Sequence, residues 1–468
     1  MEYRIERDSL GEVKVPAQAL YGAQTMRAVE NFPVSGQTLP PAFTKAQAAI
    51  KLAAAQANMA VGGLEAKLGN ALIAAAEAIF AGTHNDQFVV DVFQAGAGTS
   101  QNMNINEVLA NLANGILGGE RGVYDPIHPN DHANMAQSTN DTIHAAIHIA
   151  SVCEIHQQLL PAIAALHDAL ENKAHAFDHI IKCGRTHLQD AAPVRLGQEF
   201  GAYAQMMRLG QERIEVAAKG LLPLCIGGTA VGTGLNTAPG YRKHIIDGIN
   251  QATGHKFTPA ENLFEAMQSM DAIVSAAGAL RVLATGLRKM ADDLRLMSSG
   301  PRAGLIEIRL PAVQPGSSIM PGKVNPVMPE MLNMVCLQCL GCDATIIAAA
   351  QSGQLELNVM MPVIAHNLLH EIAIITGGIK AFTEKCVIGI EANEDICKRA
   401  AERSSSLATA LNPVLGYDRA ARLAKEALDT NKSIRELVQE KDLLDKDTME
   451  QLFDADRMTR NPDESSKE

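Results

Sequence analysis

Apolar residues recur along the middle of this chain at the spacing of long, closely packed helices. The clearest case lies between residues 260 and 299, which contain no proline. Steps of four and three residues alternate there along Ile273, Ala277, Leu280, Ala284, Leu287, Ala291 and Leu294. A seam that repeats every 3.5 residues is typical of a left-handed helical bundle. At 1.5 Å per residue, about 35 helical residues span roughly 50 Å, so this helix is longer than a small domain needs.

Four further stretches show the same long apolar periodicity, and with the first they predict roughly five bundle helices. They are residues 140–183, 192–220, 328–350 and 362–390. Shorter helical patterns occupy residues 41–120, with breaks near Gly82 and at Gly96 and Gly98, and the more charged segment after residue 393. Residues 1–40 fit short strands or loops, and the polar tail 461–468 is expected to be disordered. The pattern therefore predicts a mainly α protein.

Composition agrees with packed helices and narrows the class of partner. Of the 468 residues, 47% are hydrophobic and only 4% aromatic, with no tryptophan, which favours helices over a β-sandwich. The net charge of −12 argues against nucleic acid or an anionic membrane as a partner. A small dianionic substrate remains compatible with that charge, because cations lining a cleft outweigh a distant net charge.

The eight cysteines do not form the pattern of a disulfide framework. Cys336, Cys339 and Cys342 are spaced by three residues within an apolar helical pattern, but no histidine or fourth cysteine follows at ligand spacing. We interpret them as buried packing thiols rather than as a metal site.

The N-terminus and the longest apolar runs indicate where in the cell the protein is expected. The first eight residues are charged and lack the apolar core of a signal peptide. No stretch reaches about 18 uninterrupted apolar residues. We expect a cytoplasmic protein without a membrane partner.

The richest polar segment is Gly316-Ser317-Ser318-Ile319-Met320-Pro321-Gly322-Lys323-Val324-Asn325. Its glycines and proline exclude regular helix or strand, so it is predicted to be a mobile loop. The two hydroxyls, the cation and the amide suit a carboxylate ligand, and either serine could act as a nucleophile or a base. A solvated connector is the plainer alternative. No Gly-x-Ser-x-Gly elbow surrounds the serines, which disfavours a hydrolase.

A second polar cluster lies between Gln94 and Asn104. Gly96 and Gly98 allow backbone amides to approach an anion, and Thr99 and Asn102 can add donors. Taken alone, this Gly-x-Gly-Thr segment is weak evidence for a ligand site, and a plain loop is the favoured interpretation.

The third cluster begins a long helix. Ser138, Thr139, Asn140 and Asp141 offer hydroxyls and free N–H groups that suit a carboxylate, although simple N-capping explains them as well. His128 and His132, just upstream, could ligate a metal with Asp131, but no second pair of ligands stands out. No metal site is predicted.

The fourth cluster, Gly184-Arg185-Thr186-His187-Leu188-Gln189-Asp190, separates two long helical patterns. This position concentrates polar groups at one end of the bundle. His187 titrates near neutrality and could bind or protonate a leaving group, whereas a structural role is the plainer interpretation.

These four clusters, in this order, resemble the aspartase/fumarase superfamily over essentially the whole chain. The signature Gly-Ser-Ser-x-Met-Pro-x-Lys-x-Asn is intact at 316–325, and family-like blocks occur at 228–236 and 356–359. The resemblance implies a three-domain subunit divided at 1–138, 139–393 and 394–468. It also implies a homotetramer in which the central helices form the core and three subunits supply each active site.

The resemblance further implies cleavage of a C–N or C–O bond beside a carboxylate, with release of fumarate and no cofactor. Ser317 would be the general base, with its alkoxide stabilised by loop N–H groups, and Glu330 would support the imidazole of His187. Asn140 and His187 would contact the leaving group. The β-carboxylate would be held by Thr99, Ser138, Thr139 and Ser318, and the α-carboxylate by Thr186, Lys323 and Asn325.

The segments that differ between aspartases and fumarases do not all favour the same substrate. Segments 96–100, 138–141, 326–327 and 353–358 are aspartase-like, whereas 128–131 and 227–229 are fumarase-like. Two places depart from both types: Thr142-Ile143-His144-Ala145-Ala146 stands where a Phe-Pro-Thr-Ala-like sequence is usual, and Met361 stands where a charged residue is expected.

We therefore expect deamination of L-aspartate to fumarate and ammonium. The alternatives are hydration of fumarate to L-malate and a related amino-dicarboxylate elimination. A non-catalytic helical scaffold is disfavoured by the intact Ser317, His187 and Lys323.

Overall fold

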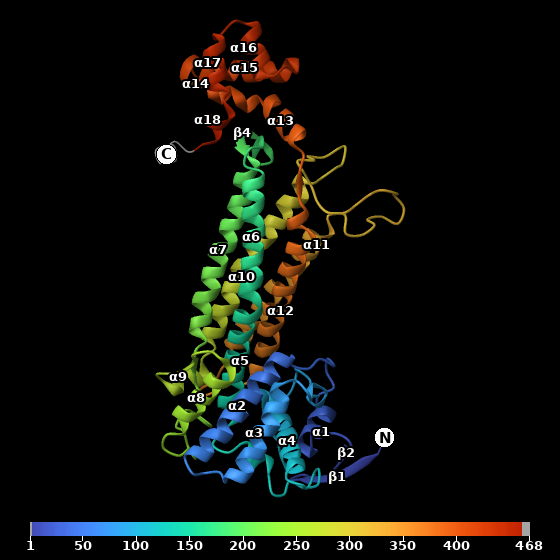
Figure 1. Cartoon of the computed structure of the whole chain (residues 1–468), viewed down its shortest axis with the longest axis vertical. Helices are drawn as coiled ribbons and strands as arrows, with labels where there is room; N and C mark the ends of the chain where they lie inside the picture. Colours follow the sequence, from blue (N-terminus) through green and yellow to red (C-terminus); the bar gives the residue numbers. More distant parts are fainter. Residues whose placement is uncertain (1, 461–468) are drawn as a thin grey trace. The chain divides into compact units, whose positions relative to one another are not determined.

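A computed structural model describes residues 2–460, and helices dominate it (Figure 1). Each of its sheets has only two strands, so the prediction of a mainly α protein is confirmed. The predicted disorder of residues 461–468 lies outside the described residues. The chain divides into two compact units, each assembled from three stretches of sequence. Unit 1 contains residues 1–161, 210–285 and 335–377, and unit 2 contains 162–209, 286–334 and 378–468.

The elements of the first 160 residues alternate short strands, helices and turns. They are β1 (Tyr3–Asp8), β2 (Gly11–Pro16), α1 (Ala23–Asn31), α2 (Pro41–Ala60), α3 (Ala66–Phe80), η1 (Asn85–Gln87), η2 (Gly96–Gly98), α4 (Thr99–Ile116), η3 (Pro129–Ala133), α5 (Thr139–Glu154) and η4 (Ile155–Leu159). The break predicted at Gly96 and Gly98 is confirmed. Helix α1 lies where only strands or loops were expected.

The middle of the chain holds the long helices. They are α6 (Leu160–Ala176), α7 (Leu196–Gly220), α10 (Asp271–Met297), α11 (Val327–Ala350) and α12 (Met361–Lys385). Between them lie β3 (Ile181–Thr186), β4 (Gln189–Arg195), β5 (Pro223–Leu224), α8 (Tyr241–Thr253), β6 (Thr258–Pro259), α9 (Leu263–Gln268) and β7 (Ile308–Arg309). The border between the two units falls within all five long helices.

The remaining elements are short. They are η5 (Val387–Gly389), β8 (Glu391–Ala392), α13 (Glu394–Arg403), η6 (Ser405–Leu411), α14 (Asn412–Leu415), α15 (Tyr417–Thr430), α16 (Ile434–Glu440), α17 (Lys446–Leu452) and α18 (Ala455–Thr459). The short helices expected after residue 393 are thus present.

The seven seam residues identified in the sequence, from Ile273 to Leu294, are buried along α10, and none of the seven is more than 1% exposed. The predicted start of this helix at residue 260 was wrong. Asn262 caps the short α9 through its side chain, and Ser269 then adopts extended backbone angles. Helix α10 begins only at Asp271.

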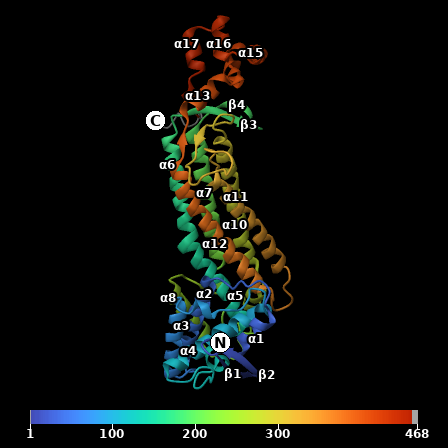
Figure 2. The same ribbon diagram turned by 90° about the vertical axis from the view of Figure 1, so that its right-hand side faces the viewer.

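The predicted helices over 140–183 and 192–220 were too long at the ends that face each other. Residues 181–186 and 189–195 instead form an antiparallel hairpin, β3–β4. The backbone at His187 and Leu188 has positive φ, 54° and 59°, which closes a two-residue turn. Figure 2 shows this hairpin beside α13, which belongs to the same unit.

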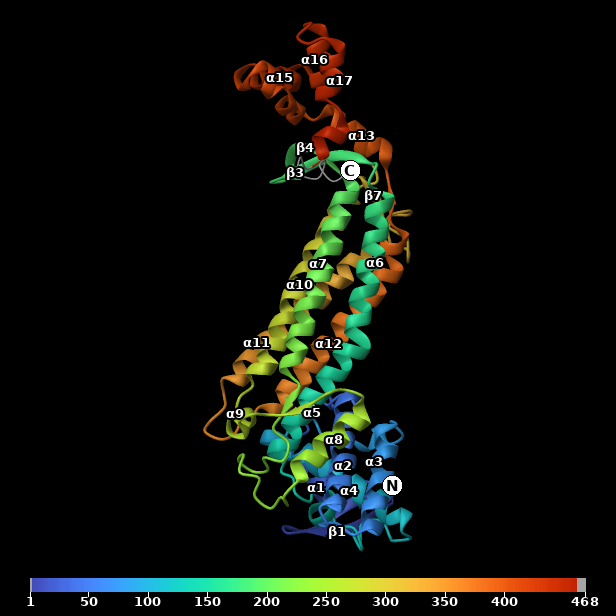
Figure 3. The same cartoon turned by 60° about the vertical axis from the view of Figure 1, so that its left-hand side comes forward.

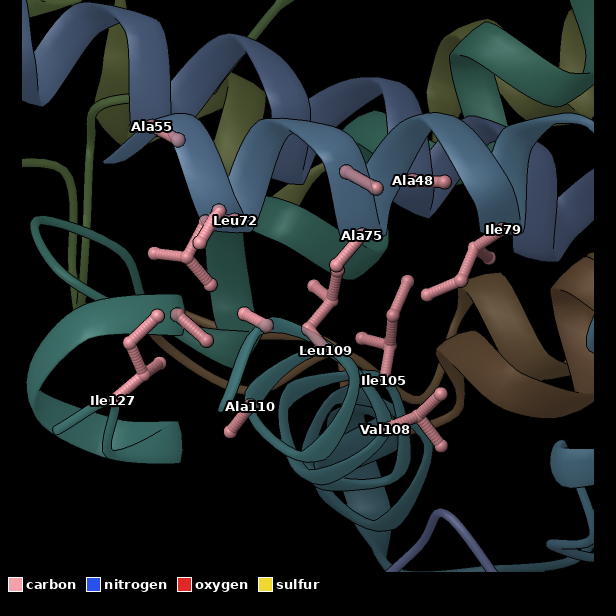
Figure 4. Close-up of a cluster of buried hydrophobic side chains, with 14 of the residues drawn as sticks. Ala48, Ala55, Leu72, Ala75, Ile79, Ile105, Val108, Leu109, Ala110 and Ile127 are labelled. Carbon is pink, nitrogen blue, oxygen red and sulfur yellow. The ribbon is translucent and has the colours of Figure 1, made fainter. Parts of the chain in front are cut away.

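The core of the N-terminal part of unit 1 lies between α2, α3 and α4 (Figure 4). Leu72, Ala75 and Ile79 of α3 meet Ile105 and Leu109 of α4, all buried. Alanines on α2 keep that helix thin, so its neighbours approach closely. Figure 3 shows α8 against α2, and a Cβ on Gly248 of α8 would lie only 2.8 Å from the Ala53 side chain.

A separate core in unit 2 holds the C-terminal helices together. Leu411, Ile434, Leu437 and Val438 are at most 1% exposed there. The partly buried hydrophobic residues around them extend to Met458, so the last turns pack onto this core.

The thiols of Cys336, Cys339 and Cys342 are buried, and the eight cysteines form no disulfide. Burial raises the pKa of the Cys339 thiol well above its usual range. Among residues 2–460, no group of three or more His, Cys, Asp or Glu side chains is placed to hold a metal ion.

Two helical stretches, Thr139–Ala176 and Val327–Ala350, are long and apolar enough to cross a membrane by length and composition. Core helices of soluble proteins pass the same test. Half of the first window is already buried inside the protein, against 33% of the second.

Candidate active site

In unit 1, a turn with left-handed backbone angles directly precedes the N-terminus of α4. Ala97 and Gly98 have positive φ, 59° and 83°, and the Ala97 N–H donates to the carbonyl of Val359 at 2.9 Å. A Cβ on Gly98 would approach Ile143 to 3.0 Å, so glycine allows α4 to begin close against α5. Thr99, the first residue of α4, is exposed. Its hydroxyl makes only a long hydrogen bond, 3.4 Å, to the Gly96 carbonyl, so it can turn towards an anion beside the N-terminus of α4.

Asn102 joins the start of α4 to the start of α5. Its Nδ2 donates to the hydroxyl of Thr139 at 3.2 Å and to Oδ1 of Asn134 at 3.1 Å. Two helix N-termini that carry predicted carboxylate ligands, Thr99 and Thr139, are thereby linked within one unit.

Ser138 is the N-cap of α5, as the plainer interpretation of the sequence expected. Its Oγ accepts from the Asn140 N–H, and its own N–H donates to Asp141 at 2.9 Å, which completes a capping box. The second carboxylate oxygen of Asp141 accepts the N–H groups of Gly227 and Thr229, each at 3.0 Å. Capping leaves the hydroxyl proton of Ser138 free to donate to a ligand.

The amide of Asn140 is oriented by the same neighbouring loop. Its Nδ2 donates to the carbonyl of Ala230 at 2.8 Å. A carbonyl only accepts, so the nitrogen must face Ala230, and Oδ1 is left as the outward atom. Asn140 therefore offers an acceptor to whatever binds beside it.

A buried lysine beneath this region was not predicted as part of the site. Lys51 of α2 is 4% exposed, and its ammonium donates to Asn134 at 3.1 Å and to Gln137 at 2.9 Å. Burial lowers the pKa of Lys51 to about 7, against the opposing effect of Asp141. The sequence signal was a polar stripe, Gln47, Lys51 and Asn58, along one side of an alanine-rich helix.

In unit 2, the β3–β4 hairpin presents Thr186 and His187 at its turn, both exposed. The register shifts between Cys183 and Arg185, which marks a bulge at Gly184. A Cβ at Gly184 would lie 2.5 Å from the Ala192 carbonyl oxygen, so the bulge requires glycine.

The loop from 316 to 325 folds back on itself. A Cβ on Gly316 would lie 2.2 Å from the carbonyl oxygen of Lys323, so only glycine allows the two ends to meet. The Asn325 amide donates to the Gly316 carbonyl at 2.8 Å, and the Lys323 ammonium donates to Asn325 Oδ1 at 2.8 Å. Lys323 retains two further donors for a carboxylate.

Ser317 has the environment expected of a serine base. Its Oγ accepts the backbone N–H groups of Met320 at 3.0 Å and Ile319 at 3.3 Å. Donors aimed at an oxygen stabilise its deprotonated form most, so this geometry favours an alkoxide.

The structure places the predicted residues in two groups. Unit 1 holds Thr99, Ser138, Thr139 and Asn140, and unit 2 holds Thr186, His187, Ser317, Ser318, Lys323, Asn325 and Glu330. Within the described part of unit 2, no hydrogen bond joins His187 to Glu330, which lies in the first turn of α11. The support of this imidazole by Glu330 stays a prediction.

Comparison with known proteins decides the family. A model described as "Lyase" matches residues 11–341, and one described as "Fumarase C C-terminus" matches residues 407–460. The chain belongs to the aspartase/fumarase superfamily. It is therefore a lyase.

Members of the superfamily with two different names are equally similar to it. Aspartate ammonia-lyase of Bacillus subtilis (strain 168) is 47% identical over 98% of this chain and 96% of its own length. Class II fumarate hydratase of Halobacterium salinarum is 50% identical over 98% and 97%. A crystal structure titled fumarate lyase:delta crystallin, from Brucella melitensis and bound to cobalt, superposes with a TM-score of 0.95 at 47% identity, covering 98% of this chain and all of that one.

The segment 142–146, which does not follow the pattern expected from the resemblance, has a local structural role. His144 of α5 donates its Nε2–H to the Ser269 carbonyl at 3.1 Å, and its ring lies 4.7 Å from that of His148. Both rings line a cleft of about 740 Å³ that includes none of the predicted site residues. Burial lowers the pKa of both imidazoles, that of His148 to about 3, so both are neutral at pH 7.

The other unexplained positions also have structural roles. Met361 is fully buried at the start of α12. Nδ1 of His128 accepts backbone N–H groups of the following turn, and Nδ1 of His132 accepts the His128 N–H at 2.9 Å. The two histidines thus stabilise the turn that precedes Ser138.

Proposed function

We propose that this lyase is an aspartate ammonia-lyase, which converts L-aspartate to fumarate and ammonium. The observation that carries the proposal is the orientation of Asn140. Because its Nδ2 is committed to Ala230, its free Oδ1 accepts hydrogen bonds. A substrate ammonium has only donors, and an oxygen acceptor matches it. A hydroxyl leaving group would in addition need a donor to protonate it.

The proposed mechanism begins at Ser317. Its alkoxide takes the proton from the carbon next to the β-carboxylate, and the electron pair moves into that carboxylate. The resulting aci-carboxylate carries a second negative charge, which needs donors that are in place before the reaction. Thr99, Ser138, Thr139 and Ser318 are proposed as these donors.

In the second step the electron pair returns, the C=C bond forms, and the C–N bond breaks with its electrons on nitrogen. Because the substituent is an ammonium, it leaves as neutral NH3, which then takes up a proton from solvent to give the product ammonium. Asn140 and His187 are proposed to hold this group, while Thr186, Lys323 and Asn325 hold the α-carboxylate. Lys323 suits that role because a charge-assisted contact is stronger than a neutral one.

Fumarate hydratase is the second candidate, because superfamily members of that name match at similar identity. The two candidates differ in the leaving group alone. Purified protein should raise the ultraviolet absorbance of fumarate when L-aspartate is supplied, and L-malate supplied separately should give at most a small rate. Turnover of L-malate alone would replace the proposal with the second candidate.

A further inference from the structure

One amide beneath the proposed carboxylate ligands of unit 1 has a fixed orientation. The Oδ1 of Asn134 accepts three N–H donors, which come from Lys51 at 3.1 Å, Asn102 at 3.1 Å and Asn106 at 3.2 Å. The Nδ2 of the same side chain donates to the backbone carbonyl of Gln137 at 3.3 Å. Because a carbonyl can only accept, the nitrogen must face Gln137, and the oxygen must face the three donors.

This orientation fixes the amide of Asn102 in turn. Since the oxygen of Asn134 lies beside it, Asn102 must present its nitrogen on that side. The second N–H of the same nitrogen donates to the hydroxyl of Thr139 at 3.2 Å. Asn102 is only 1% exposed, so its side chain cannot turn toward solvent. It therefore offers Thr139 a donor rather than an acceptor.

The hydroxyl of Thr139 has one proton, and its hydrogen-bond partner decides where that proton points. When the oxygen accepts from Asn102, the proton is free to be donated to another group. Among residues 2–460, no protein atom accepts a hydrogen bond from this hydroxyl, and Thr139 is half-buried at the start of α5. If Asn102 presented its oxygen instead, the proton would be donated to Asn102 and would be lost to a ligand.

We infer that Asn102 is a positioning residue, which keeps the Thr139 hydroxyl as a hydrogen-bond donor to the β-carboxylate of the substrate. The inference rests on the proposed function, in which Thr139 is one of the donors to that carboxylate. In this role Asn102 acts through Thr139 and not on the substrate. The negative charge on the β-carboxylate is greatest in the aci-carboxylate, so a donor that already points the right way stabilises the transition state more than the bound substrate.

Asn106 provides a matched control. It lies one turn further along α4, is 0% exposed and donates to the same oxygen of Asn134. Within the described part of the chain, no hydrogen bond joins it to Thr139. Asn102→Leu and Asn106→Leu each keep the side-chain volume close to native, and each removes one donor to Asn134. A difference between the two variants therefore measures the effect of the contact with Thr139.

The test is a double-mutant cycle with Thr139→Val, which removes the hydroxyl and keeps the shape of the side chain. In the native background, Asn102→Leu should lower kcat/KM by about 10- to 100-fold, the value of one hydrogen bond to a charged group, and mainly through kcat. In the Thr139→Val background the same change should cost less than about threefold, because the hydroxyl that Asn102 orients is already gone. Asn106→Leu should cost less than about threefold in either background.

Thermal midpoints of all variants are measured beside the kinetics. If Asn102→Leu folds poorly, Asn102→Ser takes its place, because the shorter side chain stays polar but cannot reach Thr139. Thr139→Ser keeps a hydroxyl, so the full loss caused by the Asn102 change should return in that background. Equal losses in the Asn102 and Asn106 variants, full activity of the Asn102 variant, or a loss undiminished in the Thr139→Val background would each overturn the inference.

The proposed function and this inference fail separately. L-malate has the same β-carboxylate as L-aspartate, so a protein that turns over only L-malate contradicts the proposed function, while the cycle is measured on L-malate with the same expectations. For a protein inactive on both, the cycle is measured on fumarate affinity by titration calorimetry, where Asn102→Leu should raise Kd more in the native than in the Thr139→Val background. Equal increases would overturn the inference, and a protein that binds no fumarate would overturn both proposals.

Discussion

Ser317 receives two backbone N–H groups from the turn that follows it, and these are what a serine needs to act as a base at neutral pH. A free serine hydroxyl is far too weakly acidic to lose its proton at neutral pH. An oxygen that accepts two hydrogen bonds loses its proton more easily, because the same two donors stabilise the alkoxide. The N–H groups that stabilise the proposed base therefore belong to the ten residues of its own loop.

We predict that Ser317→Ala lowers kcat by about 10²–10⁴-fold, the range for loss of a general base. KM should change little, because the substrate carboxylates keep their ligands. Steady-state kinetics in both reaction directions measure this. Ser318→Ala is the matched neighbour and should mainly raise KM. Near-normal turnover of Ser317→Ala would remove that residue from the mechanism.

Lys323 is predicted to act in binding and in turnover. Lys323→Ala removes a charge-assisted contact to the α-carboxylate, so KM should rise while kcat falls. The control is Lys380→Ala, which removes a lysine of α12 outside the proposed site. A higher KM in Lys323→Ala than in Lys380→Ala would be specific to the loss of Lys323. An unchanged KM would show that Lys323 does not contact the substrate.

Lys51 leads to a prediction about pH and stability. The pKa of Lys51 lies near 7 in the folded chain and near 10.5 when unfolded. Between these values the unfolded state binds more protons, so this residue makes stability rise with pH, by at most about 1.4 kcal/mol per pH unit. Below pH 7 the cost of the buried charge is fully present.

Denaturation of the wild type and of Lys51→Met at several values between pH 7 and 9 measures this contribution. The stability of the wild type should increase with pH relative to the variant. Lys45→Met, an exposed lysine of the same helix, should run parallel to the wild type. A constant difference between wild type and Lys51→Met would contradict the lowered pKa.

Among the elements, the loop at 316–325 depends on one glycine. The carbonyl oxygen of Lys323 occupies the space of a Gly316 side chain, so Gly316→Ala must open the loop. We predict a loss of kcat/KM of at least tenfold with little change in the thermal midpoint, since the loop adds little buried apolar surface. Activity assays beside a thermal melt test this, and full activity would show that the loop need not fold back.

Element boundaries show where sequence reasoning fell short. The 3.5-residue seam of α10 and the extent of α11 were predictable, because a packed helix has apolar residues at a regular spacing that can be seen in the sequence. The β3–β4 hairpin was not, because Ile180, Ile181 and Cys183 continue an apolar pattern that a helix and a buried strand share. The pairing of residues 181 to 195 and the glycine bulge decided the outcome.

At the scale of the whole molecule, the proposed site residues are distributed over two compact units. Helix α11 also exposes Met334 (65%) and Leu337 (49%). Large apolar side chains left open on a bundle helix are typical of an interface. Both facts are consistent with the proposed homotetramer, in which one site draws on several copies of the chain.

Mixing two inactive variants tests this arrangement. Asn140→Ala disables the ligands of unit 1, and Ser317→Ala disables those of unit 2. If a site takes its two groups from different subunits, hybrids formed after gentle dissociation should contain some intact sites and regain activity. Each variant treated alone is the control. If mass measurement confirms that hybrids have formed but they remain inactive, the site residues of unit 1 and unit 2 act together within one chain.

The sequence by itself determined the helical class, the family and the residues from which the reaction is proposed, because motif chemistry and helix periodicity are local properties. Only the tertiary structure decided which atom of Asn140 faces outward, how Lys51 is buried and that Arg185 pairs with the buried carboxylate of Glu307. These depend on groups up to 122 residues apart along the chain, and contacts at such separations leave no periodic trace in the sequence.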